Sequence, residues 1–389
     1  MPETPLLEVI DISKHFPLGG GIFTRPTAWV RAVSGVSFSV RRRERFGLVG
    51  ESGCGKTTVG RLILRLIEPT RGRIEFDGQD ILTLDRAALG RFRQRMQIIF
   101  QDPYSSLDPR MTVEQIVTEP LRAGGKHRAR AERRRVAAAL LDKVGLRAAD
   151  LEKYPHEFSG GQRQRIGIAR ALCVRPELIV ADEPVSALDV SVQAQVINLL
   201  QDLGEEFGLS FVFISHDLGV VQHVCDRIAV MYLGAIVELA PVRRFSREPR
   251  HPYTEALLAA VPLPDPNRRS GRLAMEGDVP SPIDPPPGCS FHPRCRYVFD
   301  RCQIEAPPLV QAAADHAVAC WLNDGKGLEA KDGIGLGTST HITTTLSKGR
   351  SKTDEPTQGH DSGHSEGQGR KTQTGHDDRL RLPLRPDGR

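Results

Sequence analysis

Residues Gly50 to Thr57 have the types and the spacing that phosphate binding requires. They read Gly-Glu-Ser-Gly-Cys-Gly-Lys-Thr and match the pattern G-x-x-x-x-G-K-S/T. In such a loop, glycines let backbone N–H groups converge on phosphate oxygens, the lysine supplies a cation, and the hydroxyl can ligate Mg²⁺. The residues expected to contact a nucleotide here are Gly50, Glu51, Ser52, Gly53, Cys54, Gly55, Lys56, Thr57 and Thr58.

Two adjacent carboxylates, Asp182 and Glu183, follow the apolar run Leu178–Ala181. Ligands of open α/β sheets bind at the carboxyl ends of the strands, where this pair would lie. Successive strand residues point to opposite sides, so the two neighbours can serve different roles. We expect Asp182 to hold Mg²⁺ and Glu183 to polarise an attacking water. By itself, an Asp-Glu pair after a strand is more often a simple exposed strand end.

The segment Ser159-Gly160-Gly161-Gln162 leads directly into a helical pattern. Serine is a favoured N-cap residue, and the two glycines expose backbone amides at the helix start. This predicts a second anion-binding site. Taken alone, such a segment is more often a simple helix cap without a ligand.

These groups can meet only if regular elements deliver them to one edge of a sheet. The first 245 residues alternate short β-branched runs with helical patterns, which is typical of a layered α/β fold. One helix is expected to start near Lys56 and another to cover Ser191–Phe207, where apolar residues recur at helical spacing. Buried strands are predicted at Phe46–Val49, Met96–Phe100, Leu178–Ala181, Phe211–Ile214 and Ile228–Tyr232.

The pattern changes twice further along the chain. Strand signals vanish over about residues 102–171, which predicts an inserted helical subdomain with helices at Val113–Leu121, Ala131–Val144 and Gln162–Leu172. Residues 246–322 form a small extension rich in proline and cysteine, appended to a domain of residues 1–245. Residues 323–389 lack aromatic side chains and apolar runs, so we expect a disordered tail.

Composition limits the function classes. A formal net charge of +5 over 389 residues is only mildly basic and gives no reason to expect a nucleic-acid partner. No apolar run reaches the roughly 18 residues of a spanning helix, and Met1–Leu7 does not resemble a secretory leader. We therefore expect a soluble chain, with any membrane role depending on a separate embedded partner. Its seven cysteines are expected to stay reduced.

In their order along the chain, Gly50–Thr57, Ser159–Gln162 and Asp182–Glu183 resemble the motifs of the ATP-binding cassette (ABC) ATPases, over about residues 5–245. The resemblance implies a P-loop NTPase core that binds ATP and Mg²⁺ and hydrolyses ATP during transport. The alternative within the family, a non-transport protein of DNA repair or translation, usually carries tandem ATPase sets or long insertions, which are not visible in this sequence.

The resemblance also assigns roles to residues outside the three motifs. Gln101 is similar to the family's glutamine that contacts Mg²⁺ and the attacking water, and His216 to the histidine that contacts the γ-phosphate. Phe16 occupies the place of the aromatic residue that stacks on adenine. Asp189, in the loop Ser186–Asp189, is similar to the residue that crosses a dimer interface.

Partners follow from the same resemblance. In this family Ser159 and Gly161 close over the nucleotide of a facing subunit, so a chain with one set of motifs must pair with a second ATPase domain. The helical subdomain then transmits closure to the permease. The resemblance thus implies a second ATPase, two permease subunits and an extracytoplasmic solute-binding protein, at the cytoplasmic face of the membrane.

Segments outside the common motifs point to one branch of the family. Ser186–Gln193 and His251-Pro252-Tyr253-Thr254 resemble the oligopeptide, dipeptide and nickel importers. Gly19–Trp29 and Val261–Pro266 resemble the second of the two paired ATPases of those systems, which implies a different chain as partner. Peptide uptake is the expected function, with nickel or another small solute as the alternative.

Four cysteines gather late in the sequence, at Cys289, Cys295, Cys302 and Cys320. The tight Cys-x(2–4)-Cys pair that usually marks structural zinc is absent, and longer gaps suit an iron–sulfur cluster better. Members of the branch carry a 4Fe–4S cluster in the matching segment. A zinc site and unligated cysteines remain the alternatives.

Overall fold

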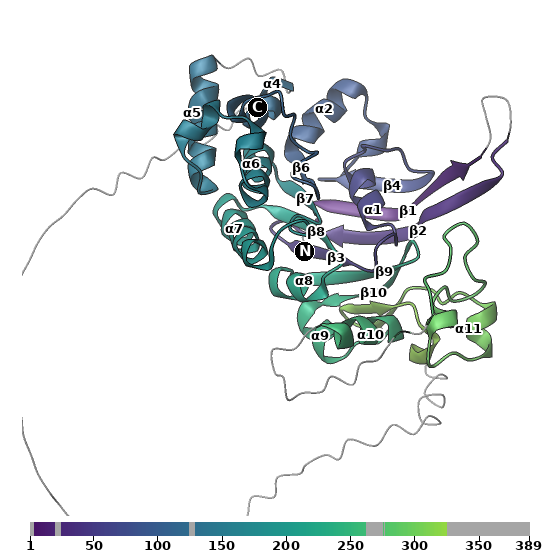
Figure 1. The fold of residues 1–389 in the computed structure, drawn as a ribbon. Helices are drawn as coiled ribbons and strands as arrows, with labels where there is room; N and C mark the ends of the chain where they lie inside the picture. The colour runs from purple at the N-terminus through teal and green to yellow at the C-terminus, as the bar shows by residue number, and fades with distance from the viewer. Residues whose placement is uncertain (1–3, 20–24, 124–128, 262–274, 276, 325–389) are drawn as a thin grey trace, which may run out of the picture. The chain divides into compact units, whose positions relative to one another are not determined.

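The computed structural model describes residues 4–19, 25–123, 129–261, 275 and 277–324, and its principal element is an eight-stranded sheet (Figure 1). The strand order is β11-β12-β10-β9-β3-β8-β7-β6. The five strands from β9 to β6 run parallel. They are β3 (Arg45–Val49), β6 (Met96–Ile99), β7 (Leu178–Asp182), β8 (Ser210–Ser215) and β9 (Arg227–Tyr232). These match the five predicted strands, and the α/β prediction is confirmed.

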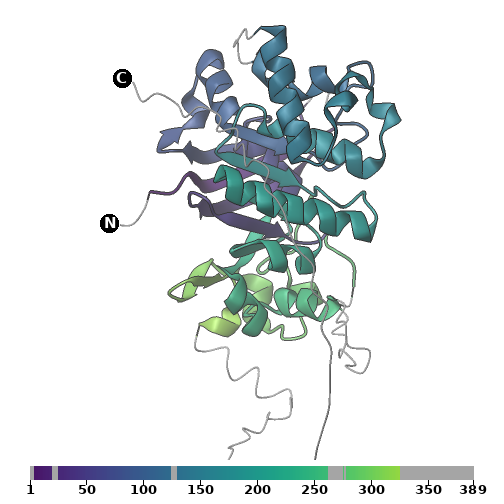
Figure 2. The same ribbon diagram turned by 90° about the vertical axis from the view of Figure 1, so that its left-hand side faces the viewer.

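Helices cover both faces of this sheet, as the two views show (Figures 1 and 2). Because both faces are covered, strands such as β7 are buried at every residue and read as continuous apolar runs. The helix α7 buries Val196, Ile197, Leu200 and Leu203 and ends at Gly208, whose φ of 64° suits glycine. The core helices are α1 (Lys56–Ile63), α2 (Arg86–Arg95), α7 (Val190–Phe207), α8 (Leu218–Val224) and α9 (Val242–Arg247).

A second, antiparallel sheet packs over the first and was not anticipated from the apolar runs. Its order is β2-β1-β4-β5. Bulges interrupt the alternation of buried and exposed residues in β1, which hides the strand in the sequence. The strands are β1 (Leu7–Leu18), β2 (Ala28–Val40), β4 (Arg71–Phe76) and β5 (Gln79–Asp80).

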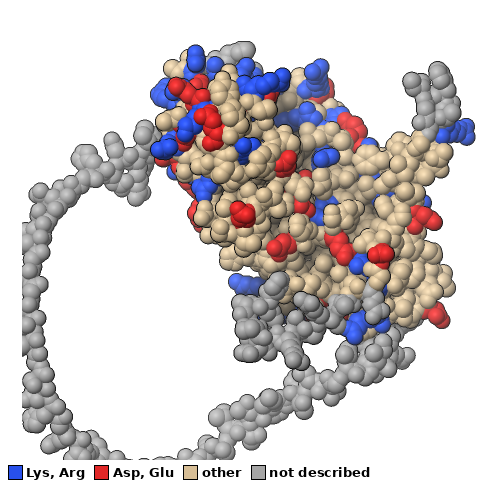
Figure 3. Space-filling model, in the orientation of Figure 1, with Lys and Arg blue, Asp and Glu red and all other residues tan. Residues whose placement is uncertain are grey.

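The inserted region between β6 and β7 is helical, as predicted, but one helix differs. The predicted helix Val113–Leu121 is two helices, α3 (Val113–Val117) and α4 (Glu119–Ala123). Pro120 has no N–H to continue the ladder, and Thr118 donates its hydroxyl to the Glu114 carbonyl at 2.7 Å. The other helices are α5 (Arg130–Lys143) and α6 (Gly160–Leu172). Charged side chains of both signs gather over this region on the face drawn in Figure 3.

The C-terminal extension adds strands to the principal sheet. The strand β12 (His316–Val318) pairs with β10 (Ala235–Pro241), and β11 (Val310–Ala313) pairs with β12. Helices α10 (Pro252–Ala260) and α11 (Asp300–Ile304) flank them. Within the described ranges, no helix has the length and apolarity to cross a bilayer. Of the predicted tail, Asn323 ends a short 3-10 helix that starts at Trp321, and residues 325–389 lie outside the described residues.

Candidate active site

The parallel strands bring the predicted catalytic groups to one edge of the sheet. The phosphate loop follows β3, Asp182 ends β7, and His216 comes directly after β8. Gln101 lies two residues beyond the end of β6. Since these four strands are parallel neighbours, their carboxyl ends share one edge.

Glycines give the phosphate loop its path. Gly55 has a φ of 105°, and a Cβ there would lie 2.2 Å from the Ala32 carbonyl oxygen. At Gly50 a Cβ would lie 2.2 Å from the Met231 carbonyl oxygen. Gly55 precedes α1 without a side-chain cap, so the first amides of this helix are left for an anion.

Lys56 and Thr57 begin α1, and their side chains form hydrogen bonds with the phosphate loop and with the end of β7, respectively. The Lys56 side chain is buried, and its ammonium donates to the carbonyls of Gly50 at 2.8 Å and Glu51 at 2.9 Å. The Thr57 hydroxyl donates to Asp182 Oδ1 at 2.9 Å. Burial raises the pKa of Asp182 despite this hydrogen bond, with a further contribution from the charge of Glu183. A desolvated carboxylate beside a hydroxyl is a donor set that suits Mg²⁺.

Two of the predicted catalytic residues, Gln101 and His216, contact the third, Glu183. Gln101 Nε2 donates to one carboxylate oxygen of Glu183 at 2.8 Å, and His216 Nδ1 lies 3.2 Å from the other. Glu183 has a φ of 45°, an uncommon conformation for a non-glycine residue. Its N–H donates to the Ile214 carbonyl at 2.9 Å, which ties the backbone to β8. The carboxylate is therefore held from both sides at the end of β7.

Ser159 and Gln162 form a reciprocal capping box at the start of α6. The Gln162 N–H donates to the Ser159 hydroxyl at 3.4 Å, and the Ser159 N–H donates to Gln162 Oε1 at 3.0 Å. Both residues are exposed, while Gly160 and Gly161 are half-buried. Asp189, at the start of α7, is also exposed and makes no side-chain cap bond. The second anion motif thus faces outward.

Phe16 lies in β1, paired with Val30 of β2. The residue is 37% exposed, and the Lys14 ammonium lies 5.1 Å from the centroid of its ring. An exposed aromatic face of this kind is available for stacking. The adenine-stacking role of Phe16 stays a prediction.

Two residues that contact the phosphate loop were missed as site residues. The Tyr253 hydroxyl accepts from the Glu51 N–H at 2.9 Å, and Arg294 binds the Glu51 carboxylate at 2.8 and 3.1 Å. In the sequence, Tyr253 is recognisable only as part of the segment His251-Pro252-Tyr253-Thr254, which resembles the importer branch. Arg294 lies 243 residues beyond Glu51, and no local pattern connects them.

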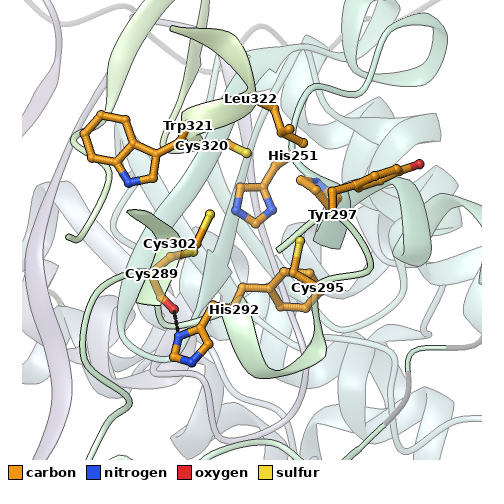
Figure 4. A pocket seen from close by; sticks show the side chains of 11 residues that line it. His251, Cys289, His292, Cys295, Tyr297, Cys302, Cys320, Trp321 and Leu322 are labelled. Carbon is orange, nitrogen blue, oxygen red and sulfur yellow. Dashed lines mark hydrogen bonds between the residues drawn. The ribbon is translucent and has the colours of Figure 1, made fainter. Parts of the chain in front are cut away.

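The four late cysteines line one cavity (Figure 4). Their sulfur atoms surround a common space beside the ring of His251. Burial raises the pKa of Cys295 and of Cys320 to about 12, and raises that of Cys289. All seven cysteines are free thiols. Among the described residues, no three His, Cys, Asp or Glu side chains are placed to hold a metal ion.

The parallel sheet, the phosphate loop, the held carboxylate and the inserted helical subdomain define a P-loop ATPase of the ATP-binding cassette class. The family model described as ABC transporter matches residues 33–186, and the model for the oligopeptide/dipeptide transporter C-terminal region matches residues 237–302. The chain belongs to the ATP-binding proteins of the ABC transporter family, and its enzymatic activity is ATP hydrolysis.

Individual relatives agree with this assignment. The chain is 54% identical over 315 residues to a probable peptide ABC transporter ATP-binding protein of Sinorhizobium fredii, covering 81% of this chain and 89% of the relative. It is 50% identical over 326 residues to the oligopeptide transport ATP-binding protein AppF of Bacillus subtilis, covering 82% and 98%. A solved ATP-binding cassette dimer bound to ADP and Pi, in a post-hydrolysis state, is 29% identical with a TM-score of 0.55, covering 61% of this chain and 99% of that one.

Proposed function

We propose that this ATPase energises the uptake of peptides through a membrane importer. The observation that carries the proposal is the match of residues 237–302 to the oligopeptide/dipeptide transporter region, which lies outside the motifs common to all ABC ATPases. Two relatives that are 54% and 50% identical to this chain, and are named for peptide and oligopeptide transport, support it. A nickel or other small-solute importer is the alternative that the test must separate.

The proposed chemistry uses the residues gathered at the sheet edge. Lys56 and the first amides of α1 bind the phosphates, while Thr57 and Asp182 would hold Mg²⁺, which neutralises phosphate charge when bound. Glu183 accepts a proton from the water whose oxygen attacks the γ-phosphorus, and the bond to the bridging oxygen breaks to release ADP and phosphate. Gln101 and His216 keep the Glu183 carboxylate oriented.

A second ATPase subunit would complete the site. Ser159, Gly161 and Asp189 are part of the proposed machinery, and the outward-facing positions of Ser159 and Asp189 suit contact with a facing domain. We propose a related but different chain as that partner, together with two permease subunits and a solute-binding protein. The complex would place this subunit at the cytoplasmic face of the membrane.

Uptake measurements in a strain lacking this chain test the proposal. Loss of labelled di- and oligopeptide uptake, restored by the wild-type chain but not by Glu183→Gln, is the expected result. The matched control is Glu205→Gln on α7, because Glu205 is a well-exposed carboxylate away from the sheet edge. Intact peptide uptake with lost nickel uptake would overturn the peptide assignment and leave the ATPase assignment standing.

We further propose that Cys289, Cys295, Cys302 and Cys320 hold a 4Fe–4S cluster. The support is four soft donors around one largely apolar cavity. Iron and sulfide content after anaerobic purification, with Cys302→Ser as comparison, decides the matter; zinc alone or no metal would refute it.

A further inference from the structure

Glu51, the second residue of the phosphate loop, is bonded through three of its groups. Its N–H donates to the Tyr253 hydroxyl at 2.9 Å, and its carbonyl accepts from Lys56 Nζ at 2.9 Å. Its carboxylate accepts from both terminal nitrogens of Arg294, at 2.8 and 3.1 Å. Tyr253 and Arg294 belong to the C-terminal extension. The extension therefore holds both the backbone and the charge of a phosphate-loop residue.

The Glu51–Arg294 ion pair is shielded from water. Only 6% of the Arg294 side chain and 24% of the Glu51 side chain are exposed. Two parallel N–H···O bonds use the planar fork of the guanidinium, which fixes geometry as well as charge. Hydrogen bonding to Glu51 raises the pKa of Arg294, so the cation persists at any physiological pH. Removing one partner would leave the other as a poorly hydrated charge.

An aromatic cluster in the core fixes the position of both contacts. The rings of Tyr232, Tyr253 and Phe291 pack together, with centroids 4.8 to 5.4 Å apart. All three side chains are buried. Arg294 ends the short 3-10 helix His292–Arg294, directly after Phe291, and its guanidinium carbon lies 6.0 Å from the Tyr232 ring centroid. Packing of the extension, rather than solvent, thus sets where Arg294 stands.

The charge of Glu51 explains why such a contact would matter. Lys56 donates to the Glu51 carbonyl, so the Glu51 carboxylate belongs to the same loop as the ammonium that must meet the phosphates. Without Arg294, this unpaired carboxylate would compete for Lys56 and repel the phosphates of ATP. With Arg294 in place, the charge of the Glu51 carboxylate is neutralised, and the carboxylate is hydrogen-bonded to the extension.

We propose that Arg294, assisted by Tyr253, is a positioning residue for ATP binding, which holds the phosphate loop through Glu51 and neutralises its carboxylate. The inference goes beyond the assignment of an ATPase, because it makes the extension a working part of the nucleotide site. It does not depend on which substrate is transported.

ATP affinity of the purified full-length chain, measured by titration calorimetry, tests the proposal. Arg294→Gln is expected to raise the Kd for ATP about tenfold, since an anion is left unpaired beside the phosphates. The double variant Glu51→Gln with Arg294→Gln is expected to return to within about threefold of wild type, because no unpaired carboxylate remains. Tyr253→Phe, which removes one hydrogen-bond acceptor, is expected to raise the Kd about threefold.

The matched control is Arg244→Gln, because the salt bridge of Arg244 with Asp315 in the extension is exposed. This variant should bind ATP within about twofold of wild type. An Arg294→Gln chain that binds ATP like wild type would overturn the proposal, and so would a double variant as weak as Arg294→Gln alone. Thermal unfolding checks the fold; if Arg294→Gln does not fold, an unchanged Kd for Tyr253→Phe overturns the proposal.

Discussion

Replacing Glu183 by glutamine is the sharpest test of the catalytic assignment. The substitution preserves size, and glutamine can still accept the hydrogen bond that Gln101 Nε2 donates at 2.8 Å. Its amide would donate to His216 Nδ1, which requires the proton of the imidazole to move to Nε2. The arrangement survives, while the group that accepts the proton of the attacking water is lost.

The magnitude follows from that single loss. General-base catalysis contributes roughly 10²- to 10⁴-fold, so kcat should fall by that factor, equivalent to about 2.7 to 5.4 kcal/mol of transition-state stabilisation. ATP affinity should stay within about threefold, since no phosphate contact changes. Phosphate release by the assembled transporter measures kcat, and retention of labelled ATP on the complex measures trapping. A fall of less than about tenfold, or ATP that is not retained, would remove Glu183 as the base.

Four further predictions concern stability, cysteine reactivity and ATP binding. His316→Ala should lower the free energy of unfolding in denaturant by about 3–5 kcal/mol, because the buried Glu238 carboxylate loses the His316 ring that lies 2.7 Å away. A decrease of less than about 1 kcal/mol would contradict this prediction. Burial of Glu238 opposes its ionisation, but hydrogen bonds, the strongest from His316, lower its pKa below 4.5. Ionised Glu238 should therefore stabilise the fold above pH 4.5, and this stabilisation should be lost as the pH falls through the lowered pKa. Unfolding measured over a series of acidic pH values would detect the loss. Iodoacetamide should modify Cys54 at least about 100-fold more slowly in the folded chain than in urea, and more slowly still with ATP. The reason is that the thiol is buried and that burial raises its pKa. Mass spectrometry would follow the modification, and fast modification of the folded chain would refute the burial argument. Gly55→Ala should abolish ATP binding, since its Cβ would meet the Ala32 carbonyl at 2.2 Å and φ is 105°; retained binding by calorimetry would show that the loop tolerates another path.

Much of the fold could be predicted because buried elements have characteristic patterns of apolar residues in the local sequence. A strand such as β7, covered on both faces, is a continuous apolar run. The antiparallel strand β1 could not be found this way, since Asp11, Lys14 and His15 interrupt it at its bulges. The break between α3 and α4 lies beside Pro120. The prediction followed the apolar periodicity of this segment and did not take the proline into account.

The active-site residues likewise fall into those that a local sequence pattern predicts and those that only tertiary contacts bring to the site. Lys56, Asp182 and Glu183 belong to short patterns whose spacing reflects one loop or one strand end. The contact between Gln101 and Glu183 could be expected only through the family resemblance, because the two residues are 82 positions apart in the sequence. Arg294 carries no such pattern, because its role depends on the tertiary packing of Phe291 and Tyr232.

The long reach of the Glu51–Arg294 contact has a consequence for synthesis of the chain. Arg294 follows Glu51 by 243 residues, and a ribosome adding roughly 5–20 residues per second needs roughly 12–50 s to cover that distance. The strand β3 can also pair only after its neighbours β8 and β9 have been synthesised. The phosphate loop is thus made early and completed late, so a nascent chain would be exposed to chaperones and proteases throughout this interval. ATP binding at full affinity would then mark the moment when translation has passed the extension.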